Sequence, residues 1–263
     1  MRSDMKVISA CSFKGGTAKT SVTLHTGACL ASDHGQRVLL IDFDAQANLT
    51  AGLGFDPDSY DSLASVLQGE KGIEEVILKT SIGNLDLIPA DTWLERVEIT
   101  GALASDRYAH ERLKKLVGTL DYDFILIDTP PSLCWLTESA LIAASHALIC
   151  AAPEFYSVKG LQRLSYFLHY IAKRHPLEVV GVVLSFWNVR GKSNDNFVHI
   201  INETFPDKLL QTKIRKDVAI SEATIHGKSV FALRPKSRAA CDLTDLTREI
   251  MDRCTSEEPV CLS

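Results

Sequence analysis

The chain is organised around one stretch near its start, Phe13-Lys14-Gly15-Gly16-Thr17-Ala18-Lys19-Thr20. It follows an apolar run, Lys6 to Ser12, that is typical of a buried strand. Residues 21–34 come next and have helical character, and this helical stretch ends at Gly35. A strand, a glycine-bearing loop with lysine and threonine, and a helix together form the context of a phosphate-binding loop. The sequence therefore predicts a nucleotide-phosphate site at this loop.

The physical basis of such a site is the set of free N–H groups at the start of the helix. These groups and the loop N–H groups point at one place, and the helix dipole favours an anion there. We expect Lys19 to reach the terminal phosphates of ATP and the Thr20 hydroxyl to ligate Mg²⁺. The predicted cofactor-binding residues of the loop are Gly15, Gly16, Thr17, Ala18, Lys19, Thr20 and Ser21.

An additional lysine, Lys14, precedes the glycines and gives Lys-Gly-Gly-x-x-Lys-Thr. This pattern resembles the deviant phosphate loop of the ParA/MinD ATPases. The resemblance implies that Lys14 crosses a dimer interface to the partner's nucleotide and acts in catalysis with Lys19. Ala18 departs from the pattern, because the family has glycine there. A Cβ at this position either crowds the phosphates or strains a glycine-like backbone.

Two further acidic segments follow apolar runs that are typical of buried parallel strands. The first, Asp42-Phe-Asp44-Ala-Gln, resembles the family's Asp-x-Asp-Pro-Gln, with Ala45 in place of proline. The resemblance implies that Asp44 positions and activates the attacking water. The second, Asp128-Thr-Pro-Pro-Ser, matches the family's second switch. Acids at strand ends beside a phosphate loop hold Mg²⁺ directly or through water. The predicted metal ligands are Thr20, Asp42 and Asp128.

Buried apolar runs alternate with helical stretches along the chain, which predicts a doubly wound α/β domain. We expect a P-loop NTPase fold with a mostly parallel sheet of seven to eight strands, as one domain over residues 1–254. The tail, 255–263, is acidic and expected to be disordered. Among the elements expected are short helices at 62–68 and 73–78, a helical region at 91–120 broken near Gly101, strands at 84–90, 146–152, 178–185 and 209–214, and a closing helix at 239–253.

The composition indicates an ordinary globular protein: 46% of its 263 residues are hydrophobic and 23% are charged. No apolar run approaches the length of ~20 residues needed to span a bilayer, and the first residues lack the apolar core of a signal peptide. A cytoplasmic location is therefore expected.

Seven cysteines without a Cys-x-x-Cys pair indicate reduced, buried thiols. The net charge of −5 offers no global attraction to nucleic acid, so DNA binding requires a local basic patch.

The resemblance extends over about residues 5 to 250 and is closer to ParA/Soj-type partition proteins than to MinD. MinD-like members end in a basic amphipathic helix that binds membrane, whereas this tail is acidic. A ParA-like chain is expected to form an ATP-dependent homodimer on the nucleoid, bind DNA non-specifically and respond to a ParB-like partner, without a membrane. Pro153 and Arg215 are expected beside the adenine. The expected DNA contacts, with Arg215 as a further candidate, are Arg190, Lys192, Lys216, Lys228, Arg234, Lys236 and Arg238.

Other interpretations stay open at this point. The basic residues listed as DNA contacts could form an ordinary solvated surface, and Ala219 stands where relatives often have a DNA-binding arginine. The same loop and fold occur in ATP-dependent ligases of the dethiobiotin-synthetase type, which need a polar substrate pocket. They also occur in iron–sulfur carrier ATPases, which need bridging cysteines; Cys134 lacks a partner in a suitable setting.

Overall fold

The computed structural model describes residues 5–99, 109–153, 157–188 and 194–255. In this part of the chain, eight strands form one sheet in the order β3-β4-β2-β5-β1-β6-β7-β8. All neighbouring pairs are parallel except β3 with β4. The strands are β1 (Lys6–Cys11), β2 (Val38–Asp42), β3 (Leu78–Lys79), β4 (Leu85–Ile88), β5 (Phe124–Asp128), β6 (His146–Ala151), β7 (Glu178–Trp187) and β8 (Leu209–Arg215).

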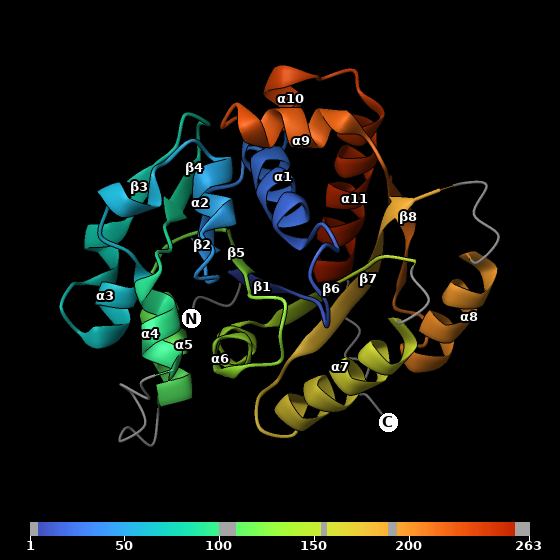
Figure 1. Ribbon diagram of the computed structural model, residues 1–263, viewed down its shortest axis with the longest axis horizontal. Coiled ribbons are helices and arrows are strands. Elements are labelled where there is room, and N and C mark those ends of the chain that lie inside the picture. Colours follow the sequence, from blue (N-terminus) through green and yellow to red (C-terminus); the bar gives the residue numbers. More distant parts are fainter. Residues whose placement is uncertain (1–4, 100–108, 154–156, 189–193, 256–263) are drawn as a thin grey trace.

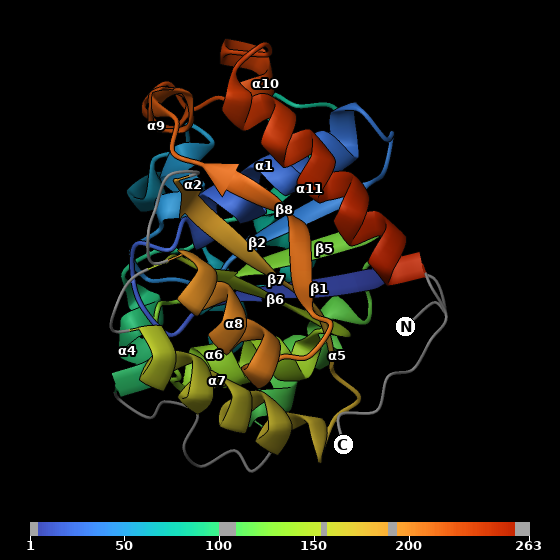
Figure 2. The same cartoon turned by 90° about the vertical axis from the view of Figure 1, so that its right-hand side faces the viewer.

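Helices cover both faces of this sheet (Figures 1 and 2). One face carries α1, α2, α9, α10 and α11, and the other carries α3 to α8. The α-helices are α1 (Lys19–Ser32), α2 (Asn48–Gly52), α3 (Leu63–Gln68), α4 (Trp93–Ile99), α5 (Arg112–Val117), α6 (Trp135–Ala143), α7 (Ser157–Ala172), α8 (Asn194–Thr204), α9 (Val218–Ile225), α10 (Val230–Leu233) and α11 (Arg238–Thr255). Short 3₁₀ turns are η1 (Pro57–Ser59), η2 (Ile73–Val76) and η3 (Ala109–Glu111).

The strands are buried on both faces, as their apolar runs predict. In β2, Leu39 and Ile41 belong to one hydrophobic core, while Val38 and Leu40 belong to the other. Successive side chains of a strand point to opposite faces, so a strand between two helical layers has no solvent side. The predicted fold class, a mostly parallel sheet of seven to eight strands between helices, is confirmed.

The structure corrects two of the expected boundaries. Residues 73–78 are not one helix, because Ile73–Val76 form a single 3₁₀ turn and Leu78 begins the antiparallel edge strand β3. Glu75 closes that turn by accepting a hydrogen bond from the Gly72 N–H at 2.7 Å. The expected tail at 255–263 starts one residue too early, since Thr255 is still in α11. The predicted break near Gly101 lies outside the described residues.

Two connections from opposite halves of the chain meet at a pair of glycines. Gly54, after α2, and Gly227, after α9, both have positive φ angles, of 85° and 60°. A Cβ added to Gly227 would lie 2.6 Å from the Gly54 Cα, so only glycine fits this approach. The contact fixes α9 beside the segment that follows the second strand.

A buried histidine gives the fold a pH dependence with a defined sign. His25 in α1 is fully buried; its Nδ1 accepts a long hydrogen bond (3.4 Å) from the Val230 N–H, and among the described residues its Nε2 has no partner. Burial lowers the pKa of His25 from 6.5 to about 4. The unfolded chain therefore binds this proton more tightly than the folded chain. The stability that neutral His25 provides is complete above pH 6.5 and is lost as the pH falls toward 4.

We expect the wild-type free energy of unfolding to fall between pH 7 and pH 4 by about 3 kcal/mol more than that of His25→Gln. Glutamine keeps an acceptor for the Val230 N–H but cannot take up the proton. Denaturant titrations at the two pH values measure the difference. Equal pH dependence in the two proteins would contradict the assignment to His25.

Candidate functional site

The loop between β1 and α1 brings three predicted residues together. Lys19 Nζ lies 2.7 Å from Asp128 Oδ1, and the Thr20 hydroxyl donates to Asp128 Oδ2 at 2.6 Å. Asp128 reaches them because β5 pairs with β1, with Ala10 opposite Asp128. The site lies at the carboxyl ends of the central strands, where open α/β sheets bind ligands.

The charge of Lys19 is set by burial and by Asp128 together. The Lys19 side chain is 6% exposed. Burial lowers the pKa of the ammonium, but the charge and hydrogen bond of Asp128 outweigh burial, so the pKa lies above its usual value. Lys19 therefore stays charged at neutral pH, as phosphate binding requires.

A pocket of about 460 Å³ opens over this loop. All seven predicted loop residues line it, as do Lys14 and Asp44. The Thr17 hydroxyl is buried without a hydrogen-bond partner among the described residues, so it can donate to an incoming anion. The full lining is Ser12, Lys14, Gly15, Gly16, Thr17, Ala18, Lys19, Thr20, Ser21, Leu24, Asp44, Gln46, Asn48, Ala51, Pro131 and Thr224.

Ala18 adopts a left-handed backbone conformation, which favours glycine. Its φ and ψ are 58° and 21°, in the left-handed region, at the start of α1. An L-residue in this region costs roughly 1–2 kcal/mol. Of the two consequences expected for a Cβ at this position, the backbone strain is the one that the structure displays. The loop retains its shape, since the Val22 N–H still donates to the Ala18 carbonyl at 2.8 Å.

Ala18→Gly is expected to raise the free energy of unfolding by about 0.5–1 kcal/mol, because it removes the strain but adds glycine's entropy. Ala47→Gly is the matched control, since Ala47 also has a positive φ of 51° at a helix start but does not line the pocket. Denaturant titration should give similar stabilisation for both. Only Ala18→Gly should change ATP turnover. A sharp rise in the turnover rate would show that the natural alanine slows hydrolysis.

Asp44 lies at the pocket as a nearly buried carboxylate, 8% exposed. Its Oδ1 accepts from the Gln46 N–H at 3.1 Å, which holds the side chain toward the loop. Burial raises its pKa, while the Gln46 N–H and Lys19 lower it in part. A carboxylate with a raised pKa is suited to accept a proton from water.

Asp42, the other acid of this segment, is held by hydrogen bonds to Thr50 and Asp44. Its Oδ2 accepts from both the N–H and the hydroxyl of Thr50, at 2.8 and 2.7 Å, and its Oδ1 accepts from the Asp44 N–H at 3.3 Å. Asp42 is fully buried and does not line the pocket. Burial, and then the charge of Asp128, raise its pKa to about 7. Through these contacts Asp42 fixes the loop that carries Asp44, and its role as a Mg²⁺ ligand stays a prediction.

The residues expected beside the adenine do not line this pocket. Arg215 donates instead to Asp242 of α11, with Nη2 2.6 Å from Oδ1, and the adenine role of Pro153 stays a prediction. The sequence argument did not identify Leu24, Pro131 and Thr224 as pocket residues. Pro131 lies within the Asp-Thr-Pro-Pro-Ser match, so that motif could have indicated it.

The structure describes most, but not all, of the residues expected to contact DNA. Arg190 and Lys192 lie outside the described residues. Seven basic and two acidic residues lie between positions 213 and 238, around α9 and α10. Arg234 forms an ion pair with Glu222 at 3.0 Å, and Arg238 lies 3.8 Å from Asp217. The expected contacts that are exposed in this region are Lys216, Lys228, Arg234, Lys236 and Arg238.

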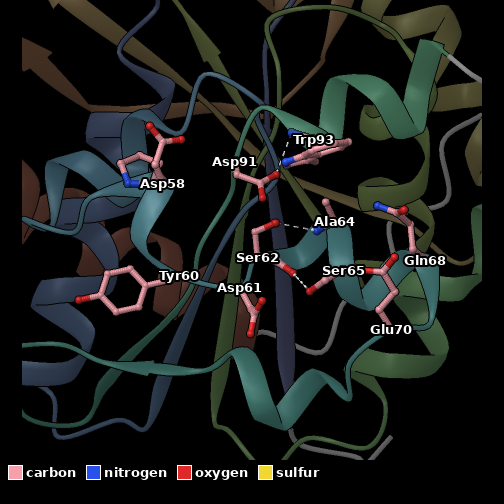
Figure 3. Close-up of a pocket in the computed structure, with 11 residues that line it drawn as sticks. Asp58, Tyr60, Asp61, Ser62, Ala64, Ser65, Gln68, Glu70, Asp91 and Trp93 are labelled. Carbon is pink, nitrogen blue, oxygen red and sulfur yellow. Dashed lines mark hydrogen bonds between the residues drawn. The ribbon is translucent and has the colours of Figure 1, made fainter.

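A second pocket, of about 360 Å³, is acidic (Figure 3). Asp58, Asp61, Glu70 and Asp91 lie around Ser62 in this view. Residues 56–95 hold nine acidic and two basic residues, a charge of −7, so the rest of the chain carries +2. We call residues 56–95 the acidic region. Its charge repels nucleic acid from this side of the molecule.

The sequence is similar to that of known proteins over most of its length. A family described as an AAA domain matches residues 5–179. A ParA family protein of Chlamydia muridarum is 67% identical over 249 residues, which cover 94% of this chain and 98% of that protein. The chain belongs to the ParA family.

More distant relatives agree with this assignment. The ParA-family chain is 35% identical to the sporulation initiation inhibitor protein Soj of Bacillus subtilis, with 93% of this chain and 98% of Soj covered. A crystal structure of cobyrinic acid a,c-diamide synthase from Mycobacterium smegmatis, with bound ADP and magnesium, matches with a TM-score of 0.83 at 25% identity, covering 97% of each chain.

The site residues of the ParA-family chain fit a nucleotide with Mg²⁺. Within the described ranges, no group of three or more His, Cys, Asp and Glu side chains is arranged to hold a metal ion. A metal here would therefore rest on Thr20, Asp128 and the phosphates themselves. The unpartnered Thr17 hydroxyl and the charged Lys19 suit those phosphates. In the same ranges, no helix has both the length and the apolar character needed to cross a membrane.

Proposed function

We propose that this ParA-family protein is a slow ATPase that partitions a chromosome or plasmid. ATP would assemble two copies into a sandwich dimer, the dimer would bind DNA without sequence preference, and a ParB-like partner would stimulate hydrolysis and release it. Residues 1–254 would form the single ATPase domain of this cytoplasmic, nucleoid-associated protein. Membership of the ParA family supports the partition function; the remaining steps are what the resemblance to ParA proteins implies.

The observation that carries the proposal is the different placement of two lysines in one pocket. Lys19 is buried against Asp128, whereas Lys14 is exposed at the same pocket. Lys19 already supplies a buried cation to the bound phosphates. In the proposed dimer, the exposed Lys14 would contact the phosphates of the second copy.

Each remaining residue of the site has a defined part in this proposal. The loop N–H groups, Thr17 and Lys19 bind the phosphates. The Thr20 hydroxyl and Asp128 would hold Mg²⁺, which neutralises charge on the phosphates when bound. Asp44 orients a water molecule and accepts its proton. Because the site is enclosed by a dimer partner in this proposal, bulk water is excluded.

Helix α9 links the nucleotide site to the basic residues that flank it in the chain. Thr224 of α9 lines the pocket, and the Gly54–Gly227 approach fixes α9 against the connection after α2. We therefore expect closure around ATP to move α9 and the exposed Lys216, Lys228 and Lys236 together. Phosphate contacts add in number, so a dimer that doubles them binds DNA much more tightly than a monomer.

The deciding experiment measures binding to duplex DNA with ATP, with ADP and without nucleotide. Binding should require ATP, fall steeply with salt, and be lost in Lys14→Ala. Lys236→Glu should weaken binding while leaving ATP affinity and dimerisation unchanged. Lys71→Ala, in the acidic region, is the control and should leave binding unchanged. Equal binding in all three nucleotide states would rule out the switch.

A second candidate function is an ATP-dependent biosynthetic ligase of the dethiobiotin-synthetase type. The structural match to an amide synthase supports it, because that enzyme shares the fold over nearly its whole length. ATP turnover distinguishes the two functions. A partition ATPase turns over in the absence of any small organic substrate, whereas a ligase requires its acid substrate.

A further inference from the structure

Helix α7 presents an exposed face that contains basic and aromatic side chains and no acidic ones. The segment from residue 157 to 174 contains no Asp or Glu. We call its exposed cations and tyrosines the basic face of α7. The residues of this face are Lys159, Arg163, Tyr166, His169, Tyr170, Lys173 and Arg174.

The spacing of these residues places them along one side of the helix. Positions 159, 163, 166, 170 and 174 follow the three-to-four residue repeat, while Leu161, Leu164, Leu168 and Ile171 are buried against the sheet. A helix of this length is about 24 Å long. The cations therefore form a row that can follow several consecutive phosphates.

Among the described residues, no neighbouring carboxylate neutralises this row. The helices packed on α7 contribute Glu138 from α6 and Asp195 and Glu203 from α8, and Glu203 is paired with His199 at 3.3 Å. In the described part of the chain, no ion pair joins a cation of the basic face to a carboxylate. The chain as a whole carries −5, so this local positive surface is opposite in sign to the molecule.

Favourable interaction with the helix dipole explains the presence of only some of these cations. Lys173 and Arg174 lie at the C-terminal end, where cations interact favourably with the helix dipole. Lys159 lies in the first turn, where the dipole disfavours a cation, and Arg163 gains nothing from either end. These two charges require another explanation.

The tyrosines indicate which polyanion fits. Tyr166 is 78% exposed and Tyr170 is 45% exposed. The Arg174 guanidinium already lies over the Tyr170 ring, 4.5 Å from its centroid, so the face can hold stacked planar groups. Aromatic side chains between cations are typical of surfaces that bind single strands, where unpaired bases stack and phosphates meet the cations.

We propose that the basic face of α7 binds single-stranded nucleic acid, with the cations on the phosphates and an unpaired base on Tyr166. This surface is separate from the one proposed for duplex DNA. The α9–α11 region lies on one face of the sheet, and α7 lies on the other (Figures 1 and 2). The inference therefore goes beyond the proposed partition function and does not require it.

The surface is also close to the nucleotide loop. A Cβ added to Gly160 would lie 1.9 Å from a ring carbon of Phe13, so the start of α7 packs directly on the loop that carries Lys14. Substitutions that test the surface should avoid this contact. Arg163 and Lys173 are suitable because both are exposed.

The experiment uses the full-length protein without nucleotide and an oligothymidylate of about 20 nucleotides as the probe. Fluorescence anisotropy at low salt should give at least about ten-fold weaker binding for Arg163→Glu/Lys173→Glu than for wild type. Tyr166→Ala should weaken binding by roughly five-fold or more. The control Lys71→Glu/Arg248→Glu changes the net charge equally outside this face and should bind within two-fold, roughly, of wild type.

Other results would overturn the proposal. Equal oligonucleotide affinity of the α7 variant and its control would show that the basic face of α7 does not bind nucleic acid. Binding of wild type to anionic phosphatidylserine vesicles but not to the oligonucleotide would assign the face to a membrane. Self-association that the α7 variant abolishes, without oligonucleotide binding, would assign it to the acidic region of a second copy. ATP-dependent duplex binding, measured in the same variants, reports on the partition function and should stay unchanged.

Discussion

Lys19→Ala is expected to weaken ATP binding by about 100-fold or more, because it removes the buried cation that meets the phosphates and leaves the Asp128 charge without a counter-ion. The 2.7 Å contact between Lys19 and Asp128 sets the position of that cation before nucleotide arrives. Isothermal titration calorimetry with ATP measures the loss. Lys14→Ala is the matched control, since a lysine that acts on a second subunit should leave the monomer's affinity unchanged.

The fold must survive the substitution for this result to be informative. Lys19→Ala leaves the buried Asp128 carboxylate without its ammonium, so the thermal midpoint of the apo protein should be measured alongside. Lys19→Ala/Asp128→Asn removes both charges and should restore the midpoint while ATP binding stays lost. An unchanged ATP dissociation constant in either variant would show that Lys19 does not bind the phosphates.

Asp44→Ala is expected to lower ATP turnover by about 100-fold while ATP affinity changes little. Asp44 lines the pocket and is held by the Gln46 N–H, but it makes no contact with Lys19 or Thr20 among the hydrogen bonds of the site. Its loss should therefore affect the attacking water and not the bound phosphates. The ATP-bound dimer should accumulate as a consequence, which size-exclusion chromatography with ATP measures.

Asp44→Asn provides the sharper comparison, because asparagine can still accept from the Gln46 N–H but is a poor base. If turnover falls equally in the alanine and asparagine variants, the proton-accepting role is supported. If ATP binding collapses in both, Asp44 is a structural residue of the loop, and its predicted catalytic role is wrong.

The sheet could be predicted from the sequence because its central strands are covered on both faces. Val38–Asp42 and Phe124–Asp128 are continuous apolar runs that end in an acid, a pattern that few other environments produce. The edge strand β3 was harder to predict from the sequence. Leu78–Lys79 is a strand only because β4 lies beside it, and its own two residues carry no strand pattern. The neighbouring residues 73–76 therefore suggested a longer helix.

The contact of Lys19 and Thr20 with a strand-end acid was also predictable. Motif spacing fixes the loop residues on a helix start, and parallel strands bring their carboxyl ends to one edge, so Asp128 had to lie near them. Ala18 was identified as a departure in the same way. Its left-handed φ of 58° is a property of the backbone that the motif imposes, whatever residue occupies the position.

The apolar strands, the phosphate loop and the family resemblance depend on local spacing and side-chain type, so they could be predicted from the residues alone. Which of two neighbouring acids faces the pocket depends on the packing of the folded chain. Asp42 and Asp44 follow the same strand, but Thr50 takes both available contacts of one Asp42 oxygen. The packing likewise brings Pro131 and Thr224 to a pocket lined otherwise by residues 12–51, and it turns Arg215 to Asp242. Such contacts join residues that are distant in the chain, and packing sets them.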